Sequence, residues 1–351
     1  MSTVALDAMG GDYAPAATVE GALRAAAASA GGEPIEVLLV GDEEAIEREL
    51  RRLGGAPGTV RIVHAPDAIA MQEHAAIETR HRRQSSIYVG LELVKRGEAD
   101  AFVSLGNTGA VLALALVVLG RLRGVERPAL CVLIPRTTGP KLLLDVGANA
   151  ESRASHLVQF AQLGVEYMRT VVGVPDPAVG LLSIGEEGTK GSPLIIEANA
   201  ALSASTLRFI GNVEGRDIVE GDADVVVTDG FTGNVALKLA EGVVSVVFGE
   251  MRAVVGRGWR GRLGGALIRP AIREVRDRLD YRRYGGVPLL GVDGVVIVGH
   301  GRSDAEAVAN AVRAADVAVR QHMLESMAAA IAAARAEATS RPPRLSGGPT
   351  G

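Results

Sequence analysis

Apolar residues along this chain of 351 residues follow two alternating patterns. Short, nearly continuous apolar runs are typical of buried parallel strands, and longer stretches with an apolar residue every three or four positions are typical of helices. The short runs predict strands at residues 4–7, 35–40, 60–63, 101–105, 129–134, 141–146, 179–184, 207–210, 224–228 and 294–298. The longer stretches predict helices at residues 16–30, 43–53, 84–97, 107–122, 152–170, 192–204, 232–255 and 304–335.

This alternation predicts an α/β protein whose mostly parallel sheet is covered by helices on both faces. The length fits one large domain or two tightly joined ones, and we assign residues 1–335 to a single α/β domain. Residues 336–351 are rich in Pro, Gly and Ser without apolar periodicity. We therefore predict a disordered tail there.

Seven segments rich in Gly, Asp and Asn interrupt the pattern, most of them directly after a predicted strand. They are residues 6–12, 104–109, 144–149, 183–191, 211–215, 228–234 and 299–303. In an open parallel sheet, ligands bind beyond the carboxyl ends of the strands. Glycine permits close backbone approach, and the start of a following helix presents amides to anions. The segments predict one large site, at this edge, for an anionic or carbonyl-bearing small molecule.

The side chains of these segments have structural as well as functional interpretations. Residues that stand where helix caps belong are Asn107, Thr108, Thr232 and Asn234. Capping and anion binding are compatible, because both use the same unpaired amides of the first turn. His300 could act as an acid or base, donate to an anion, or serve only the structure.

Four carboxylates stand at predicted strand ends: Asp7, Asp12, Asp145 and Asp229. They could bind Mg²⁺, position a lysine or hold loops through hydrogen bonds. We favour the last of these interpretations.

Composition narrows the class of protein. The net charge of −4 argues against a partner such as nucleic acid that requires a basic protein. The single cysteine, Cys131, lies in an apolar run and is expected to be a small buried side chain. No signal peptide is apparent, and the apolar residues 111–119 are too few to span a bilayer. We therefore expect a cytoplasmic location.

Lysine is rare in this chain, because arginine supplies 33 of the 37 basic residues. A retained lysine suggests a need for a compact point charge. Lys190 and Lys238 lie in or beside the Gly/Asp/Asn segments, whereas Lys95 is more simply explained as a surface residue. Lys190 is therefore our candidate catalytic cation.

The region 250–284 differs in charge from the rest of this acidic chain. It holds ten arginines against four acidic residues, an excess of about six, together with the only tryptophan, Trp259. Basic charge among scattered large apolar residues fits an amphipathic segment at a membrane surface or a docking site for an acidic protein. A merely solvated pair of helices is the simpler alternative.

Two nucleotide-binding motifs are absent or misplaced. Residues 256–261 match G-x-G-x-x-G, with Asp280 further on, but no strand directly precedes them. No G-x-x-x-x-G-K-[S/T] sequence is present. We expect neither a dinucleotide site there nor a nucleoside triphosphatase.

The segments, in their order, resemble the bacterial acyl-acyl-carrier-protein:phosphate acyltransferases of phospholipid synthesis. The matching sequences include L-D-A-M-G-G-D-Y-A-P, S-L-G-N-T-G-A, L-L-D-V-G-A-N, I-G-E-E-G-T-K-G, G-N-V-E-G-R-D, D-V-V-V-T-D-G-F-T-G-N-V-A-L-K, P-L-L-G-V-D-G and V-G-H-G-R-S. The resemblance covers roughly residues 3–325, and Leu105 stands where the family more often has alanine.

The resemblance implies a three-layer α/β/α fold related to isocitrate and isopropylmalate dehydrogenases and to phosphotransacetylases, and a homodimer. It implies acyl transfer from acyl carrier protein to inorganic phosphate. The acyl phosphate would then serve a membrane glycerol-3-phosphate acyltransferase in phosphatidic acid synthesis. Residues around 240–285 would form a protruding helical hairpin that contacts the membrane peripherally. No cofactor or metal is expected.

Phosphate is already a nucleophile at neutral pH, so the reaction needs positioning and oxyanion stabilisation rather than a catalytic Ser or Cys. As a hypothesis, the amides of residues 106–109 hold phosphate, Lys190 neutralises charge, and Asn234 and His300 donate to the oxyanion. The phosphate-binding set is Gly106, Asn107, Thr108 and Gly109. Asp229 completes the candidate catalytic set of Lys190, Asn234 and His300. The residues expected to support these groups are Asp7, Gly10, Gly11, Asp12, Asp145, Asn149, Gly230, Thr232 and Lys238.

Acidic carrier protein could dock on the region 250–284 or on the cluster Arg80, Arg82 and Arg83, or the region could meet anionic lipid. The residues expected to form this contact patch for carrier protein or membrane are Arg252, Arg257, Trp259, Arg260, Arg262 and Leu263. Three rival functions are a phosphate acetyl- or butyryltransferase that uses coenzyme A, a decarboxylating dehydrogenase of related fold, and a scaffold without catalysis.

Overall fold

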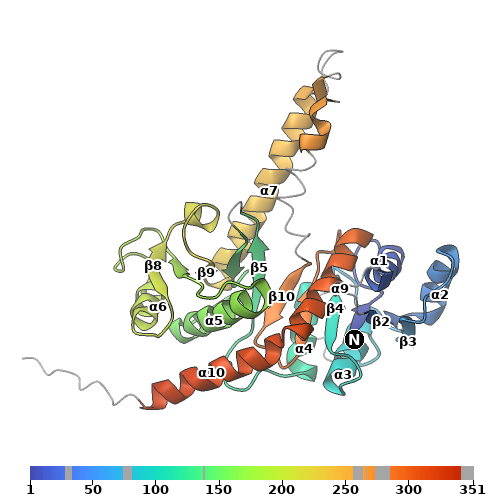
Figure 1. The fold of residues 1–351 in the computed structure, drawn as a ribbon, viewed down its shortest axis with the longest axis horizontal. Helices are drawn as coiled ribbons and strands as arrows, with labels where there is room; N and C mark the ends of the chain where they lie inside the picture. The colour runs from blue at the N-terminus through green and yellow to red at the C-terminus, as the bar shows by residue number, and fades with distance from the viewer. Residues whose placement is uncertain are drawn as a thin grey trace, which may run out of the picture.

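The computed structural model describes residues 1–27, 34–73, 81–136, 139–255, 264–265, 267–272 and 285–340. Figure 1 shows a sheet with helices packed against it and one long helix, α7, that projects from the body. The strands are β1 (Ser2–Asp7), β2 (Ile35–Gly41), β3 (Val60–His64), β4 (Ala101–Ser104), β5 (Ala129–Ile134), β6 (Lys141–Leu144), β7 (Val179–Leu182), β8 (Phe209–Val213), β9 (Val225–Val227), β10 (Val287–Leu290) and β11 (Val295–Val298). The longer helices are α1 (Ala16–Ala27), α2 (Glu43–Arg52), α3 (Ser86–Lys95), α4 (Thr108–Val118), α5 (Ala154–Tyr167), α6 (Pro193–Ser203), α7 (Gly230–Val255), α9 (Ala305–Arg320) and α10 (Met323–Ser340).

The sheet has the strand order β3-β2-β1-β4-β11-β10-β5-β6-β9-β7-β8. The five strands β3, β2, β1, β4 and β11 are parallel to one another. The four strands β6, β9, β7 and β8 form a second parallel group. Three successive antiparallel pairs, β11–β10, β10–β5 and β5–β6, join the two groups. Three reversals make the two parallel halves run in opposite directions. The expectation of one common edge for all seven polar segments is therefore wrong.

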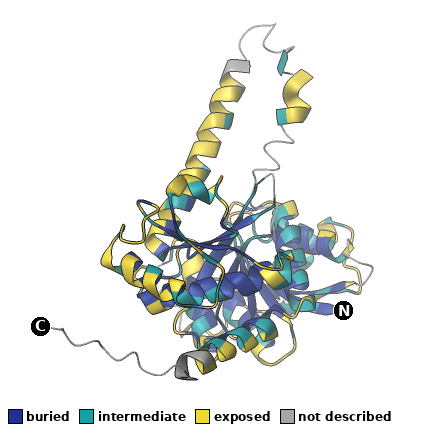
Figure 2. Cartoon of the chain, turned by 60° about the vertical axis from the view of Figure 1, so that its left-hand side comes forward, coloured by how far each residue is buried: buried dark blue, intermediate teal, exposed yellow. Residues whose placement is uncertain are grey.

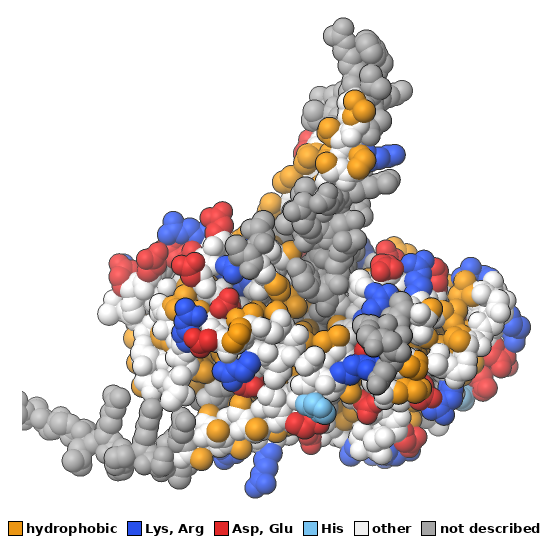
Figure 3. Space-filling view, in the orientation of Figure 1, with side chains coloured by type: hydrophobic (Ala, Val, Ile, Leu, Met, Phe, Trp, Pro, Cys, Tyr) orange, Lys and Arg blue, Asp and Glu red, His pale blue; other side chains and the backbone are white. Residues whose placement is uncertain are grey.

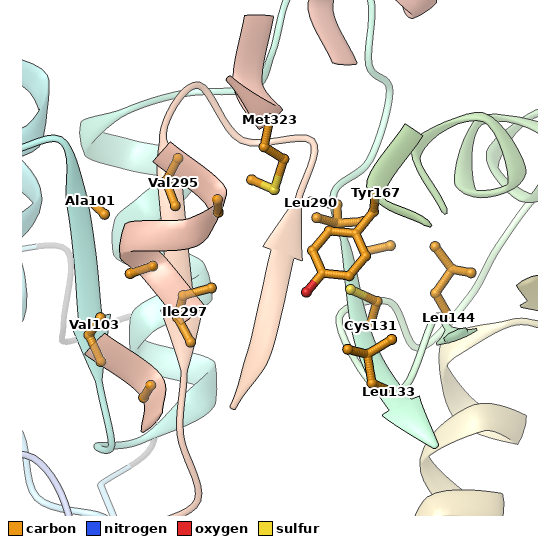
Figure 4. Close-up of a cluster of buried hydrophobic side chains, with 14 of the residues drawn as sticks. Ala101, Val103, Cys131, Leu133, Leu144, Tyr167, Leu290, Val295, Ile297 and Met323 are labelled. Carbon is orange, nitrogen blue, oxygen red and sulfur yellow. The ribbon is translucent and has the colours of Figure 1, made fainter. Parts of the chain in front are cut away.

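Two hydrophobic clusters lie on opposite faces of the sheet. One contains side chains of α1, α2, α5, α6, α9 and α10, and the other those of α3, α4 and the start of α7. The three layers therefore agree with the expected α/β/α fold. Cys131 is fully buried beside Tyr167 in the first cluster (Figure 4), and burial raises the pKa of its thiol well above the usual value. The prediction of a buried cysteine is confirmed.

The structure departs from the expected elements in three places. Strand β10 escaped prediction because it contains Pro288, which lacks an N–H and argues against a central strand. The expected helix 304–335 is two helices, α9 and α10, separated near His322, whose φ is 52°. Helix α10 continues to Ser340, so residues 336–340 of the predicted tail are helical, and residues 341–351 lie outside the described residues.

Helix α7 leaves the body with most of its surface exposed (Figures 1 and 2). By length and composition alone, residues 230–251 could cross a membrane. Only 6% of the most apolar stretch of this helix is buried in the protein. Hydrophobic side chains mark its projecting part (Figure 3). The predicted patch residues Arg257, Trp259, Arg260, Arg262 and Leu263 lie outside the described residues, as does the side chain of Arg252.

Candidate active site

A cleft of about 450 Å³ opens between the start of α4 and residues 234–241 of α7. It crosses the central antiparallel strands, because Leu130 of β5 and Val287 of β10 line it together with Val146 after β6. The main-chain N–H of Val146 donates to the carbonyl of Leu130 at 3.0 Å, which places the end of β6 in the middle of the sheet. Residues from both halves therefore meet in one cleft despite the opposite strand directions.

Five of the seven polar segments reach this cleft, and two do not. Segments 6–12, 104–109, 144–149, 228–234 and 299–303 each contribute lining residues. Segments 183–191 and 211–215 contribute none. Lys190 belongs to one of these two segments and is exposed on the loop after β7. Its proposed catalytic role remains a prediction.

The cleft combines polar groups with an apolar wall. Its polar and charged side chains are Asp12, Thr108, Asn234, Lys238, Glu241, His300, Arg302 and Ser303. Its larger apolar side chains are Met71, Leu112, Leu130, Val146, Leu237, Val287 and Val298. A small polar reactant and an apolar chain can therefore occupy the same cleft.

The start of α4 presents backbone donors to the cleft. Thr108 and Gly109 are the first two helical residues, and their amides have no acceptor among the described residues. Asn107 is the N-cap, since its Oδ1 accepts from the N–H of Ala110 at 3.1 Å. The N–H of Gly106 instead donates to the hydroxyl of Ser104 at 3.1 Å. The amides of segment 104–109 that line the cleft without an acceptor among the described residues are therefore those of residues 108–109.

Asp7 holds two glycine-rich segments together. Its carboxylate is buried and accepts from Ser104 Oγ at 2.7 Å and from the N–H of Met9 at 3.1 Å. A side chain at Gly10 would lie 2.5 Å from Asp7 Oδ2 and 2.7 Å from the nitrogen of Gly106. Burial raises the pKa of Asp7, and its hydrogen bonds oppose this. Asp7 thus fixes the loop beside α4.

Asp12 and Gly11 join the first segment to the last. The N–H of Asp12 donates to the carbonyl of Gly301 at 2.7 Å, and Gly11 has φ of 102°. The carboxylate of Asp12 lies 4.0 Å from Nε of Arg302 at the exposed rim. Asp12 therefore contributes a partly neutralised negative charge to the cleft.

Asp145 organises the segment after β6. One carboxylate oxygen accepts from the backbone of Leu130, Gly147 and Ala148, and the other from the backbone and carboxamide of Asn149, at 2.8–3.1 Å. Burial raises the pKa of Asp145 in spite of these hydrogen bonds. Because its acceptor sites are occupied by the protein, Asp145 is a loop-holding residue, as is Asn149, which also donates to the carbonyl of Pro128 at 2.7 Å.

Helix α7 begins against the loop that Asp145 holds. A side chain at Gly230 would lie 2.3 Å from the carbonyl oxygen of Asn149, and one at Gly233 would lie 1.9 Å from that of Asp145. Asp229 accepts from both the N–H of Thr232 (2.9 Å) and its hydroxyl (2.7 Å), so Asp229 is the cap.

The next turn of α7 brings side chains to the cleft. The side chain of Asn234 lines the cleft beside Gly147 and makes no hydrogen bond with the described residues. Lys238 lies 3.6 Å from Glu241 across one turn of the helix. Lys238, together with Arg302, therefore supplies the positive charge that borders the cleft, where the sequence had favoured Lys190.

His300 is oriented by its own loop. Its Nδ1 accepts from the N–H of Arg302 at 3.1 Å, and its carbonyl accepts from the hydroxyl of Ser303 at 2.6 Å. An accepting Nδ1 places the proton of the neutral ring on Nε2. The imidazole lines the cleft with a donor nitrogen of defined identity.

Lys141 and Arg82, two basic residues outside the cleft lining, are held by other contacts. Lys141 is buried, and its Nζ donates to the carbonyls of Asp217 and Gly221. Burial lowers the pKa of Lys141. Of the alternative docking arginines, Arg82 pairs with Asp67 and Glu73, Arg83 is exposed, and Arg80 lies outside the described residues.

Sequence reasoning missed Met71 and the apolar wall of the cleft. The wall residues were assigned to strands or helices, and their spacing gave no sign that one side would face a cavity. The sequence H-A-P-D-A-I-A-M at residues 64–71 carries no known chemical motif. Within the described residues, no group of three His, Cys, Asp or Glu side chains is arranged to hold a metal ion.

The fold places the chain in a structural class. It is similar to a phosphotransacetylase from Streptococcus pyogenes, with a TM-score of 0.59, 19% identity and 94% of each chain covered. It is also similar to a branched-chain phosphotransacylase from Enterococcus faecalis, with a TM-score of 0.58, 17% identity and coverage of 91% and 99%. A 4-hydroxythreonine-4-phosphate dehydrogenase from Klebsiella pneumoniae shares the fold at a TM-score of 0.52, with 14% identity and coverage of 93% and 98%. The architecture is thus that of the phosphotransacylases and of a related dehydrogenase.

Sequence comparison identifies the family within that class. Residues 2–326 match the family model described as "Fatty acid synthesis protein", so the chain belongs to this family. It is 52% identical over 322 residues to a phosphate acyltransferase from Thermus thermophilus (92% of this chain, 96% of the relative) and 45% identical over 328 residues to one from Pelotomaculum thermopropionicum (93% and 94%). The protein is an acyltransferase.

Proposed function

We propose that this protein transfers a fatty acyl group from acyl carrier protein to inorganic phosphate and releases acyl phosphate. The observation that carries the proposal is the cleft itself, in which amides and donors suited to an oxyanion lie beside an apolar wall. Phosphotransacylases of the same fold also transfer acyl groups, and relatives at 45–52% identity are phosphate acyltransferases. The carrier-protein donor is the finer part of the proposal.

In the proposed reaction, a phosphate oxygen attacks the carbonyl carbon of the thioester, and a tetrahedral oxyanion forms. Collapse of this intermediate breaks the carbon–sulfur bond, so the acyl group leaves on phosphate and the carrier thiolate takes up a proton. Holding phosphate in line with the carbonyl replaces a covalent protein nucleophile. Donors directed at the oxyanion then lower the barrier.

The amides of Thr108 and Gly109 are our candidates for phosphate binding, because anions bind at helix N-termini. His300 Nε2 and the carboxamide of Asn234 are the candidate donors to the oxyanion. Lys238 and Arg302 border the same cleft and would compensate the charge of phosphate.

The direct test supplies long-chain acyl-carrier protein with and without inorganic phosphate and follows acyl phosphate by mass spectrometry. A parallel reaction contains acetyl- or butyryl-coenzyme A in place of the carrier protein. We expect phosphate-dependent loss of the carrier thioester. Turnover with coenzyme A thioesters alone would instead establish the phosphate acetyl- or butyryltransferase, and no phosphate-dependent loss in either reaction would refute acyl transfer to phosphate.

Lys190 provides a second comparison. The Lys190→Ala variant reports on the loop after β7, whereas Lys238→Ala reports on the edge of the cleft. We expect the larger rise in the KM for phosphate in Lys238→Ala. A larger rise in the KM for phosphate in Lys190→Ala would support the catalytic role that the sequence predicted for Lys190.

We further propose that two copies of the chain associate through α7. Apolar side chains recur along its exposed surface at Phe231, Val235, Leu239, Val243 and Val246. Their spacing of three to four residues forms one stripe, and such a stripe is stable in water when another apolar surface covers it. The described part of the chain leaves it exposed, and we assign the covering surface to a second copy.

For the region 250–284 we propose peripheral contact with an anionic membrane, where acyl phosphate would reach a glycerol-3-phosphate acyltransferase. Leu267 and Ile268 are 75% and 46% exposed beyond the end of α7. We expect Leu267→Glu with Ile268→Glu to abolish flotation with anionic vesicles. Unchanged flotation of that variant, together with weakened carrier-protein binding, would assign the region to carrier protein.

A further inference from the structure

The segment of residues 67–73, which we call the strap, forms one wall of the cleft through Met71. The strap is folded by its own hydrogen bonds. The N–H of Glu73 donates to the carbonyl of Ala70 at 3.2 Å, and the N–H of Ala70 donates to Oε1 of Glu73 at 2.9 Å. These reciprocal bonds close a compact turn around Met71.

Arg82 fastens both ends of the strap. Its guanidinium donates to the two carboxylate oxygens of Asp67, to the carboxylate of Glu73 and to the carbonyl of Ala68. The pairing lowers the pKa of Asp67, because the hydrogen bonds from Arg82 favour its ionised form. A planar guanidinium that contacts two carboxylates fixes their relative positions more firmly than a point charge would.

Asn107 attaches the strap to α4. Its Nδ2 donates to the carbonyls of Met71 and Glu73 at 3.1 and 3.0 Å, while its Oδ1 caps the helix by accepting from Ala110. A carboxamide has two N–H donors, and here both are directed to the strap. The side chain of Asn107 therefore retains no N–H for phosphate.

Met71 spans the cleft mouth to the opposite loop. A side chain at Gly301 would lie 2.5 Å from the terminal methyl carbon of Met71, so the thioether packs directly on the backbone after β11. Met71 is still 38% exposed, and it lines the cleft. A methionine side chain can adapt its shape to an apolar ligand. At the mouth of the cleft, Met71 fills space that Gly301, which has no side chain, leaves open.

We propose that Met71 limits the width of the acyl group that the cleft accepts, and that Asn107 is a positioning residue that acts through the strap. The inference rests on the proposed acyl transfer to phosphate. A residue beside the acyl group changes discrimination between acyl groups, whereas a phosphate ligand changes the KM for phosphate. The two roles of Asn107 are therefore separable by measurement.

The selectivity experiment compares carrier-protein thioesters of branched and straight acyl chains of equal length. We expect Met71→Ala to raise the branched-to-straight ratio of kcat/KM by about tenfold and Met71→Phe to lower it, since one methylene in an apolar pocket changes discrimination by about that factor. Val219→Ala, an exposed apolar position outside the cleft, is the matched control and should leave the ratio unchanged. An unchanged ratio in both Met71 variants of an active enzyme overturns the role of Met71.

Asn107→Ser keeps a good helix cap and removes both donors to the strap. We expect the acyl ratio to shift in the same direction as in Met71→Ala, with the KM for phosphate within about twofold of the unsubstituted protein. A rise of about tenfold or more in that KM, with an unchanged acyl ratio, would make Asn107 a phosphate ligand and refute the proposal.

Amide hydrogen exchange tests the strap without catalysis. Loss of two hydrogen bonds should speed exchange in residues 67–73 of Asn107→Ser by about tenfold or more, and leave α9 unchanged. Equal exchange rates would show that Asn107 does not hold the strap. If the unsubstituted protein forms no acyl phosphate, the proposed function fails, and the exchange rates still decide whether the strap depends on Asn107.

Discussion

At the scale of single residues, the four strand-end aspartates separate by burial into two kinds. Asp7 and Asp145 are buried and their oxygens accept several hydrogen bonds from neighbouring loops. Asp12 and Asp229 lie nearer the surface, where they meet Arg302 and cap α7. Loop holding, the role favoured from the sequence, describes Asp7, Asp145 and Asp229.

Asp7 should make stability fall as pH rises. Burial raises its folded-state pKa above 3.8, so between the unfolded and folded pKa values the folded protein binds more protons than the unfolded chain. The free energy of unfolding then decreases with pH by at most about 1.4 kcal/mol per pH unit for one group, and the stabilisation by the protonated form is complete only below the unfolded pKa. Urea titrations of the unsubstituted protein and Asp7→Asn should give a difference that changes in this sense above about pH 4. A pH-independent difference would contradict the raised pKa.

His300 should act on turnover more than on phosphate binding. If Nε2 donates to the developing oxyanion, His300→Ala should lower kcat by about 10²–10³, as the removal of one oxyanion donor does. His300→Gln, which retains an N–H donor, should recover part of the loss. Steady-state kinetics at saturating phosphate measure both, and full activity of the alanine variant would exclude His300 from the reaction.

At the scale of elements, α7 shows why glycine in a polar segment need not face a ligand. Gly230 and Gly233 lie where a side chain would meet the backbone of Asn149 or Asp145, so their role is to let the helix approach a loop closely. The same sequence, D-G-F-T-G-N, had suggested backbone approach to a ligand. Only Asn234 at its end lines the cleft.

Two glycines of α7 should respond in opposite ways to alanine. Gly233→Ala places a methyl group 1.9 Å from the carbonyl oxygen of Asp145 and should destabilise the protein by about 1–3 kcal/mol, because the helix must shift. Gly242→Ala, with nothing within 4 Å, should stabilise it by about 0.4–1 kcal/mol through helix propensity. Urea denaturation measures both. Equal effects would mean that the start of α7 has room that the structure does not show.

At the scale of the whole molecule, the sheet joins two oppositely directed parallel halves and still assembles one cleft. The reason is that the loop after β6 ends on the face of the central strands, where α7 begins against it. Each half contributes donors that the other lacks: the first supplies the start of α4 and His300, and the second supplies Asn234 and Lys238.

Association of two copies should depend on α7. Leu239 is 66% exposed and Val243 is 52% exposed on the stripe. We expect Leu239→Glu with Val243→Glu to convert a dimer to a monomer in sedimentation velocity, because burying two unpaired carboxylates in an apolar interface is unfavourable. Val219→Glu, exposed on the body, should leave the mass unchanged. A monomeric unsubstituted protein would refute the proposed association.

Most of the fold was predictable because its strands are apolar and separated by well-marked helices. Strand β10, which takes part in two of the three antiparallel pairs, was not predictable, since Pro288 argues against a central strand. Some residues of the candidate site were likewise predictable from the sequence, and others were not. Asn107 was recognisable as a cap from local spacing, but the cap of α7 is Asp229 and not Thr232 or Asn234, where the spacing had placed it. The distance of Lys190 from the cleft depends on strand order, which spacing does not encode. The link between Asn107 and Met71 joins residues 36 positions apart and was equally hidden.

The position of β11 between β4 and β10 has a consequence for synthesis on the ribosome. Strands β1 to β4 are made early, yet β4 gains its neighbour on that side only when residues 295–298 have been made. Strands β5 to β9, by contrast, occupy one continuous stretch, and β6 to β9 pair only with one another and with β5. The middle of the chain can thus pair β5 to β9 with one another early, although β5, like β4, gains its other neighbour only when the end of the chain is made. A nascent chain that stops before residue 295 exposes an unpaired edge of β4, which is a surface for chaperones or for aggregation.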